Sequence, residues 1–117
     1  MRGADIANSS VTQSAEAWVD LGAHEDVVFF LDVREVSAGT TVKMYYETAP
    51  VREQGAFLSM NQGFALAAGV RVDRFFSSNG GVVPARYVRW RMQRTAGVKW
   101  DVTFRIWLAT YAWRRSA

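Results

Sequence analysis

The sequence predicts an all-β fold, a single antiparallel β-sandwich or jelly roll. Several segments alternate apolar and polar residues with a period of two, short clusters of glycine and polar residues separate them, and no long amphipathic helix interrupts the pattern. The chain has 117 residues, which is the size of one ordinary domain. Hydrophobic residues make up 50% of the chain and aromatic residues 14%, which suffices for a core and excludes general disorder.

The first half of the chain predicts an edge segment followed by a hairpin. Residues 1–14 are small and polar, so we expect an arm or a loosely held edge strand. Residues 15–21 (AEAWVDL) predict a short first strand. Residues 26–36 (DVVFFLDVREV) predict a strand that is covered on both faces in its first half. A turn with Gly39 leads to residues 41–48 (TVKMYYET), and the two segments together predict an antiparallel hairpin.

The middle of the chain has a weaker pattern. Pro50 ends the preceding strand because its ring nitrogen cannot donate a ladder hydrogen bond. Residues 56–76 fit neither the helical nor the strand period well, and their glycines argue against a continuous helix. We expect two short strands there, near 57–60 and 70–76.

The last part of the chain predicts a second hairpin. Residues 85–94 (ARYVRWRMQR) and 98–111 (VKWDVTFRIWLATY) alternate clearly, and a Thr-Ala-Gly turn separates them. With these elements, the sandwich domain should occupy residues 15–112. The arm or edge strand at 1–14 precedes it, and a basic aromatic tail at 113–117 follows it.

The second predicted hairpin sorts its side chains into two faces. Trp90, Trp100 and Phe104 fall on the inner face, where replacement of a tryptophan by alanine should cost about 3–5 kcal/mol of stability. The outer face should carry five residues side by side if the two strands pair as neighbours: Tyr87, Arg89, Arg91, Arg105 and Trp107. The same alternation places Tyr45 on the outside of the first hairpin.

This outer face is the candidate interaction surface. Arginine, tryptophan and tyrosine are enriched at the energetic centres of protein interfaces. We expect an exposed indole such as that of Trp107 to be covered by the second sheet, an arm or a partner. A solvated face decorated with guanidinium groups is the structural alternative. With the aromatic basic tail included, the predicted surface consists of Tyr45, Tyr87, Arg89, Arg91, Arg105, Trp107, Trp113, Arg114 and Arg115. A sugar-binding platform using Tyr45, Trp107 or loop residues near Asn79 stays open as the alternative.

Composition argues against most catalytic chemistry. The chain has no cysteine and one histidine, His24, which precedes Glu25 and Asp26 in a predicted turn. A zinc site needs at least three suitable ligands, although a calcium site of Asp20, Glu25 and Asp26 stays open. No serine lies in a nucleophile elbow and no glycine-rich phosphate loop is present. We therefore expect a protein that is not an enzyme and that holds no cofactor or metal.

Charge and hydropathy argue against two classes of partner, nucleic acids and membranes. The net charge of +3 is too small to predict a nucleic-acid partner. No apolar run approaches the roughly 20 residues that span a bilayer, so we expect no membrane segment. No secretory signal is visible at the N-terminus, which predicts synthesis in the cytoplasm.

Three strand-shaped stretches carry a resemblance. VKMYYETAP (42–50), ARYVRWRM (85–92) and VTFRIWLA (102–109) resemble strands of small β-sandwich structural proteins of tailed phages and prophages. The last two are also similar to discoidin-like jelly rolls that bind carbohydrate or lipid headgroups. The phage resemblance implies a non-catalytic virion component, such as a head decoration, head–tail or tail accessory protein. Such a component would bind protein subunits of a larger assembly and form homo-oligomers.

Overall fold

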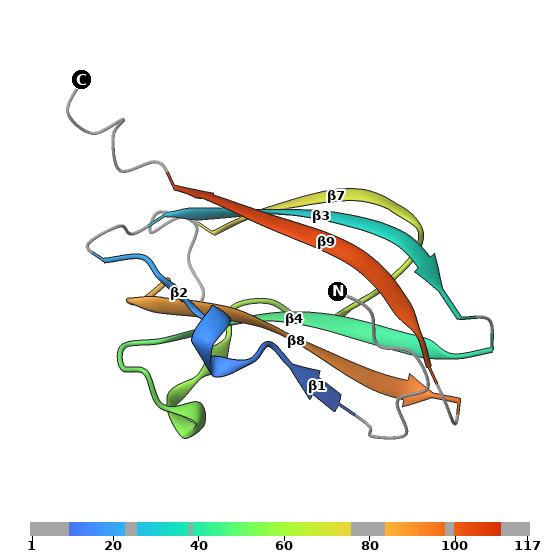
Figure 1. Cartoon of the computed structure of the whole chain (residues 1–117), viewed down its shortest axis with the longest axis horizontal. Helices are drawn as coiled ribbons and strands as arrows, with labels where there is room; N and C mark the ends of the chain where they lie inside the picture. Colours follow the sequence, from blue (N-terminus) through green and yellow to red (C-terminus); the bar gives the residue numbers. More distant parts are fainter. Residues whose placement is uncertain (1–9, 23–25, 38, 76–83, 98–99, 111–117) are drawn as a thin grey trace.

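The protein is a sandwich of two antiparallel sheets, as the sequence predicted (Figure 1). The computed structural model describes residues 10–22, 26–37, 39–75, 84–97 and 100–110. One sheet has three strands in the order β7-β3-β9, with bounds Gly69–Phe75, Val27–Val36 and Val102–Thr110. The other has six strands, with bounds Ser10–Thr12 (β1), Val19–Asp20 (β2), Thr41–Ala49 (β4), Leu58–Ser59 (β5), Phe64–Ala65 (β6) and Tyr87–Ala96 (β8).

In the six-stranded sheet, β8 and β4 form the centre. The short strands β1 and β2 both pair with β8, and β5 and β6 both pair with β4. Two 3-10 turns interrupt the chain beside this sheet, Ala15–Ala17 (η1) and Gln54–Ala56 (η2). Among the described residues there is no helix that is long and apolar enough to cross a membrane.

Both hairpin predictions are wrong, because each turn crosses from one sheet to the other. β3 lies in the three-stranded sheet and β4 in the six-stranded sheet, and β8 and β9 are separated in the same way. Their apolar faces meet across the core: the rings of Phe29 on β3 and Tyr46 on β4 stack at 4.1 Å. Trp90 on β8 meets Phe104 on β9 edge to face at 5.2 Å. A period of two fixes which side chains share a face, but it does not identify the neighbouring strand.

The chain passes back and forth between the two sheets. It passes from β1 and β2 to β3 in the other sheet, returns for β4, β5 and β6, and then alternates between the sheets through β7, β8 and β9. In the described part of the chain, the three-stranded sheet ends at β9 on one side and at β7 on the other.

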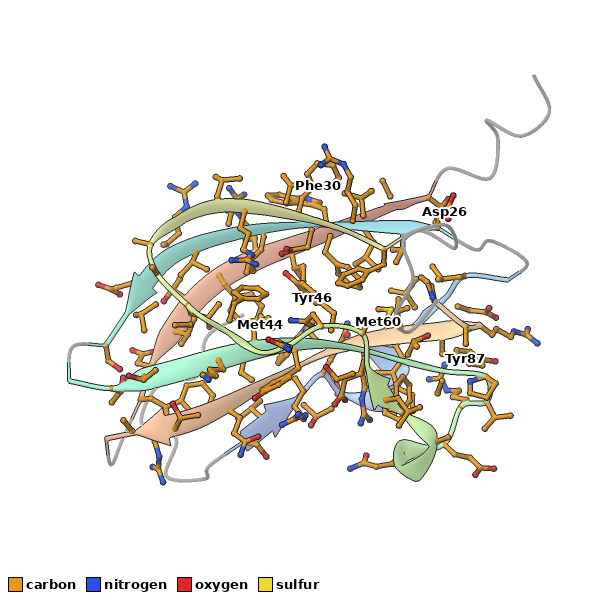
Figure 2. The ribbon with its side chains drawn as sticks, turned by 180° about the vertical axis from the view of Figure 1, so that it is seen from behind. Asp26, Phe30, Met44, Tyr46, Met60 and Tyr87 are labelled. Atoms are coloured by element: carbon orange, nitrogen blue, oxygen red, sulfur yellow. The ribbon has the colours of Figure 1, made fainter. Side chains whose placement is uncertain are left out.

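The core lies between the two sheets and confirms the predicted inner faces. Trp90, Trp100 and Phe104 are each less than 5% exposed. The inner residues of the first predicted hairpin are also buried: Val27, Phe29, Leu31, Val33, Val42, Met44 and Tyr46. Figure 2 shows Tyr46 between the sheets and Phe30 on the outer side of the three-stranded sheet.

The N-terminal prediction is partly corrected. The predicted strand at 15–21 is instead the 3-10 turn η1 followed by the two-residue strand β2. In the predicted arm, the described part contains β1, which is an edge strand beside β8. The indole nitrogen of Trp18 donates a 2.8 Å hydrogen bond to the carbonyl oxygen of Gln13, which folds this segment back on itself. In the middle of the chain, β5 and β7 lie where two short strands were expected, and β6 was not predicted.

Candidate functional site

The predicted interaction surface is divided between the two outer faces of the sandwich. Because β8 and β9 belong to different sheets, its residues do not lie side by side as expected. One group lies on the outer face of the six-stranded sheet: Tyr45, Tyr87, Arg89 and Arg91. Arg105 and Trp107 lie on the outer face of the three-stranded sheet. Trp113, Arg114 and Arg115 are outside the described residues, as are Asn79, His24 and Glu25.

Arg89 forms a buried ion pair on the six-stranded sheet. Its Nε lies 2.8 Å from Oε1 of Glu47, which is directly opposite on β4. Phe57 and Trp18 cover the guanidinium, whose carbon lies 3.9 Å and 5.1 Å from the centres of their rings. Nη1 of Arg89 is buried with no hydrogen-bond partner among the described residues. Arg89 is therefore part of a closed structural cluster, and a partner cannot reach it without displacing these two rings.

Arg91 and Tyr45 complete this cluster. Nε of Arg91 lies 2.9 Å from Oε2 of Glu47, so a single carboxylate bridges two guanidinium groups. The guanidinium carbon of Arg91 lies 4.3 Å from the centre of the Tyr45 ring. The ring also packs against Gly63, where an added Cβ would clash with the Tyr45 ring carbon Cζ. The ring of Tyr45 is therefore packed between two residues and does not offer an open platform for a sugar.

Tyr87 lies beside an exposed ion pair at the end of the same sheet. Arg86 places its guanidinium carbon 5.4 Å from the centre of the Tyr87 ring, and its Nη2 lies 3.1 Å from Oδ2 of Asp20. The hydrogen bond from Arg86 lowers the pKa of Asp20 below its usual range. Asp20 is thus engaged by an arginine, and the described residues contain no group of three or more acidic or histidine side chains that could hold a metal.

The outer face of the three-stranded sheet is different, because apolar side chains are exposed there. Val72 on β7, Phe30 on β3 and Trp107 on β9 are register neighbours and form a row across the sheet. Val70 lies two residues before Val72, on the same face of β7. Val70 is 75% exposed and Trp107 is 50% exposed. We call these four residues, Phe30, Val70, Val72 and Trp107, the apolar band.

The band exists because the polarity of β7 is inverted over residues 70–73, whereas Phe75 at the end of the strand faces the core and contacts the ring of Phe29. The valines of β7 point outward, whereas Arg71 lies opposite the buried Leu31 and therefore shares the inner face. The guanidinium carbon of Arg71 lies 3.6 Å from the ring centre of Phe64 on the opposite sheet, and its Nε lies 2.8 Å from Oδ2 of Asp73. The charged pair closes the side of the sandwich, and the valines are left on the surface.

Charges border the apolar band on one side. Oδ2 of Asp32 lies 3.1 Å from Nε of Arg34 and 3.3 Å from Nη2 of Arg105. The guanidinium carbon of Arg105 in turn lies 5.1 Å from the centre of the Trp107 ring. The outer face of the three-stranded sheet thus combines exposed valine and indole side chains with bordering arginine and aspartate side chains.

A groove of about 470 Å³ lies next to Trp107, between β9 and the segment after β1. Gln13, Ser14, Ala17, Arg105, Ile106 and Trp107 line it together with the core residues Trp90 and Phe104. The side-chain amide of Gln13 is already engaged, because its Nε2 donates to the carbonyl oxygen of Ala17 and its Oε1 accepts from the backbone nitrogen of Trp90. Few polar groups are therefore left to orient a ligand in this groove.

Sequence reasoning identified Trp107 and Arg105 but missed Phe30, Val70 and Val72. A signal for Phe30 was present in the unbroken apolar run of residues 27–31, which requires apolar side chains on both faces of β3. We had expected that face to be covered, and Val28 is indeed buried, whereas Phe30 is only half-buried. The valines of β7 gave no signal, because their alternation with charged residues indicates an inner face for them.

Comparisons with protein-family models, curated proteins and solved structures find no match for this chain.

Proposed function

We propose that this protein is a non-enzymatic assembly protein that binds neighbouring protein subunits through the apolar band. The observation that carries this proposal is the inverted polarity of β7, which exposes Val70 and Val72 beside Phe30 and Trp107. Large contiguous apolar patches on the surface of a domain often mark sites of protein contact, and arginine and tryptophan are enriched at the centres of interfaces. Small ligands bind mostly in concave pockets, so an exposed sheet face of this kind suits another protein surface better.

The setting that we propose is a virion, in which this chain acts as a head decoration, head–tail or tail accessory protein. This part rests on the resemblance of residues 42–50, 85–92 and 102–109 to structural proteins of tailed phages and prophages. In an assembly with many copies, modest contacts repeated between subunits give stable association through effective concentration. Burial of the apolar band contributes roughly 25 cal/mol for each Å² of apolar surface that is removed from water.

A carbohydrate-binding module of jelly-roll type is the second candidate function. The observation in its favour is the groove beside Trp107, where an indole, a serine hydroxyl and a guanidinium lie close together. An aromatic ring next to a few polar groups can hold a sugar ring. The engaged amide of Gln13 and the packed ring of Tyr45 make this candidate the weaker one.

Sedimentation over a range of micromolar concentrations, together with a glycan array, separates the two candidates. We expect the average mass of the wild-type protein to rise with concentration and Val72→Ser to reduce this rise. Leu58→Ser is the matched control, because Leu58 is 65% exposed on the other sheet and its replacement should leave the association unchanged. A strict monomer that binds one glycan, and loses it in Trp107→Ala, would replace the assembly proposal with the carbohydrate module.

A further inference from the structure

The outer edge of β7 can accept another strand. β7 pairs with β3 on one side, and the described residues place no strand on its other side. Figure 2 shows β7, in yellow, along this side of the three-stranded sheet. A sheet edge presents backbone donors and acceptors to any extended segment. A strand that is added to β7 would also extend the outer face, on which Val70 and Val72 are exposed.

Two charged side chains at the inner positions of this edge restrict which strand can pair with it. Arg71 and Asp73 point to the inner side of β7, and Nε of Arg71 lies 2.8 Å from Oδ2 of Asp73. Inward charges on an edge strand oppose pairing, because a strand without matching charges would bury them unpaired. A partner strand must therefore place a carboxylate opposite Arg71 and a cation opposite Asp73.

The sequence of β7 itself meets this requirement. We propose that β7 pairs with β7 of a second copy in antiparallel orientation, about a twofold axis at Val72. In this register Arg71 of each copy lies opposite Asp73 of the other, because the two residues are equally distant from the axis. The three strands of each copy then form one continuous sheet across the dimer. This inference rests on the proposed function and deepens it, because it names a second copy of this chain as a neighbouring subunit.

Three features favour this register. Val72 is the middle residue of Gly69–Phe75, so an axis there pairs the strand along its whole length. A shift by one residue would turn the inner face of one copy to the outer face of the other. An axis at Arg71 would place two guanidinium groups opposite each other, and an axis at Asp73 would do the same with two carboxylates, which is unfavourable.

The same pairing covers the exposed valines of β7. With the axis at Val72, the two Val72 side chains are neighbours, and Val70 of each copy lies opposite Arg74 of the other. The aliphatic part of an arginine side chain packs on apolar neighbours while its guanidinium stays in water. Val70 is 75% exposed in one copy, so this contact removes apolar surface from water. The apolar bands of the two copies then form one surface across the dimer.

Charge reversal at the ion pair tests this register. In Asp73→Arg only guanidinium groups meet on the inner side of the new strand pair, and we expect this variant to sediment as a monomer at concentrations where the wild-type protein is a dimer. The double variant Arg71→Asp with Asp73→Arg again places opposite charges across the axis and should recover the dimer. Thermal unfolding followed by circular dichroism checks that both variants are folded. If the double variant dissociates as much as the single one, the proposed pairing of Arg71 with Asp73 is wrong.

Disulfide trapping gives a second test, because the chain has no cysteine of its own. In Val72→Cys the two thiols lie opposite each other at the axis, where the Cα atoms of paired strands are about 4.5–5.5 Å apart, within the range of a disulfide. Most of this variant should therefore run as a covalent dimer on a non-reducing gel after mild oxidation. Leu58→Cys is the control, since Leu58 is exposed on the other sheet and its variant should stay monomeric on the gel.

The outcomes separate this inference from the proposed function. Association that depends on Trp107 but not on the charges of Arg71 and Asp73, without a disulfide in Val72→Cys, would overturn the β7 pairing and leave the outer face of the apolar band as the contact surface. A protein that stays monomeric and forms no disulfide in Val72→Cys would also overturn the pairing, and would leave the proposed function to contacts with a different protein.

Discussion

Glu47 and Arg89 are the two charged residues that are buried in the described part of the chain. They lie on the outer face of the six-stranded sheet, where the alternation of their strands predicts solvent. The rings of Trp18 and Phe57 cover them, and both rings come from irregular segments next to η1 and η2. The pair thus anchors two loops to the sheet, which is a structural role and not a contact with a partner.

This arrangement predicts a large cost for the loss of the carboxylate. Glu47→Gln keeps the shape of the side chain but leaves the guanidinium of Arg89 buried without a counter-charge. Breaking a buried pair in this way costs about 3–5 kcal/mol. Urea denaturation of the variant should show this loss in the free energy of unfolding. Asp20→Asn, which breaks the exposed pair with Arg86, is the control and should have a far smaller effect. If both variants lose the same free energy of unfolding, the pair of Glu47 and Arg89 does not have the structural role described above.

Asp20 also gives a prediction for pH. The hydrogen bond from Arg86 lowers the pKa of Asp20 in the folded protein. A lowered pKa means that the carboxylate form stabilises the fold above the pKa of the unfolded chain, and that this contribution is lost as the pH falls. An NMR titration of the Asp20 carboxyl carbon should therefore show a midpoint below the ordinary aspartate value of about 3.9, and Arg86→Ala should raise it. If the midpoint is the same in Arg86→Ala as in the wild-type protein, the hydrogen bond from Arg86 is not the cause of the lowered pKa.

At the scale of elements, β7 differs from the other long strands in the orientation of its two valines, while its Phe75 faces the core as usual. Val70 and Val72 face solvent, and Arg71 and Asp73 close the side of the sandwich over Phe64. An edge strand can adopt this orientation because long side chains at its inner positions reach solvent around the edge. A central strand such as β3 has no such exit, which is why its inner face is entirely apolar.

The inversion predicts a small effect of polar substitution on stability. Val72→Thr changes a side chain that is already on the surface, so the free energy of unfolding should change by no more than about 0.5 kcal/mol. Trp100→Ala removes an indole that is 1% exposed and should cost about 3–5 kcal/mol. Thermal or urea unfolding of both variants checks this difference. A loss of several kcal/mol in Val72→Thr would show that β7 turns its valines inward in solution.

For the whole molecule, the two crossing turns determine the architecture. Since β3 and β4 separate into different sheets, β3 pairs with β7 and β9, and β4 pairs with β8. These partners are distant in sequence, so the sheets can form only after long loops have closed.

This topology predicts slow and cooperative folding. Sandwiches built from distant strand pairs refold in roughly milliseconds to seconds. Stopped-flow fluorescence can follow the reaction, since Trp90 and Trp100 are both buried in the core. Refolding within microseconds would contradict the observed order of strands. In equilibrium unfolding, fluorescence and circular dichroism should change together, as expected for one domain.

The sequence by itself determined the long strands β3, β4, β8 and β9 and which of their side chains share a face. A period of two is a local property of the extended chain, and it placed Trp90, Trp100 and Phe104 in the core and Trp107 on the surface. Only the tertiary structure decided which strands are neighbours, that Arg89 is covered, and that the valines of β7 face outward. These three features depend on contacts between segments that are far apart in the chain. The alternation of apolar and polar residues within one strand does not show which sheet the strand joins, whether another segment covers its outer face, or which way an edge strand turns its side chains.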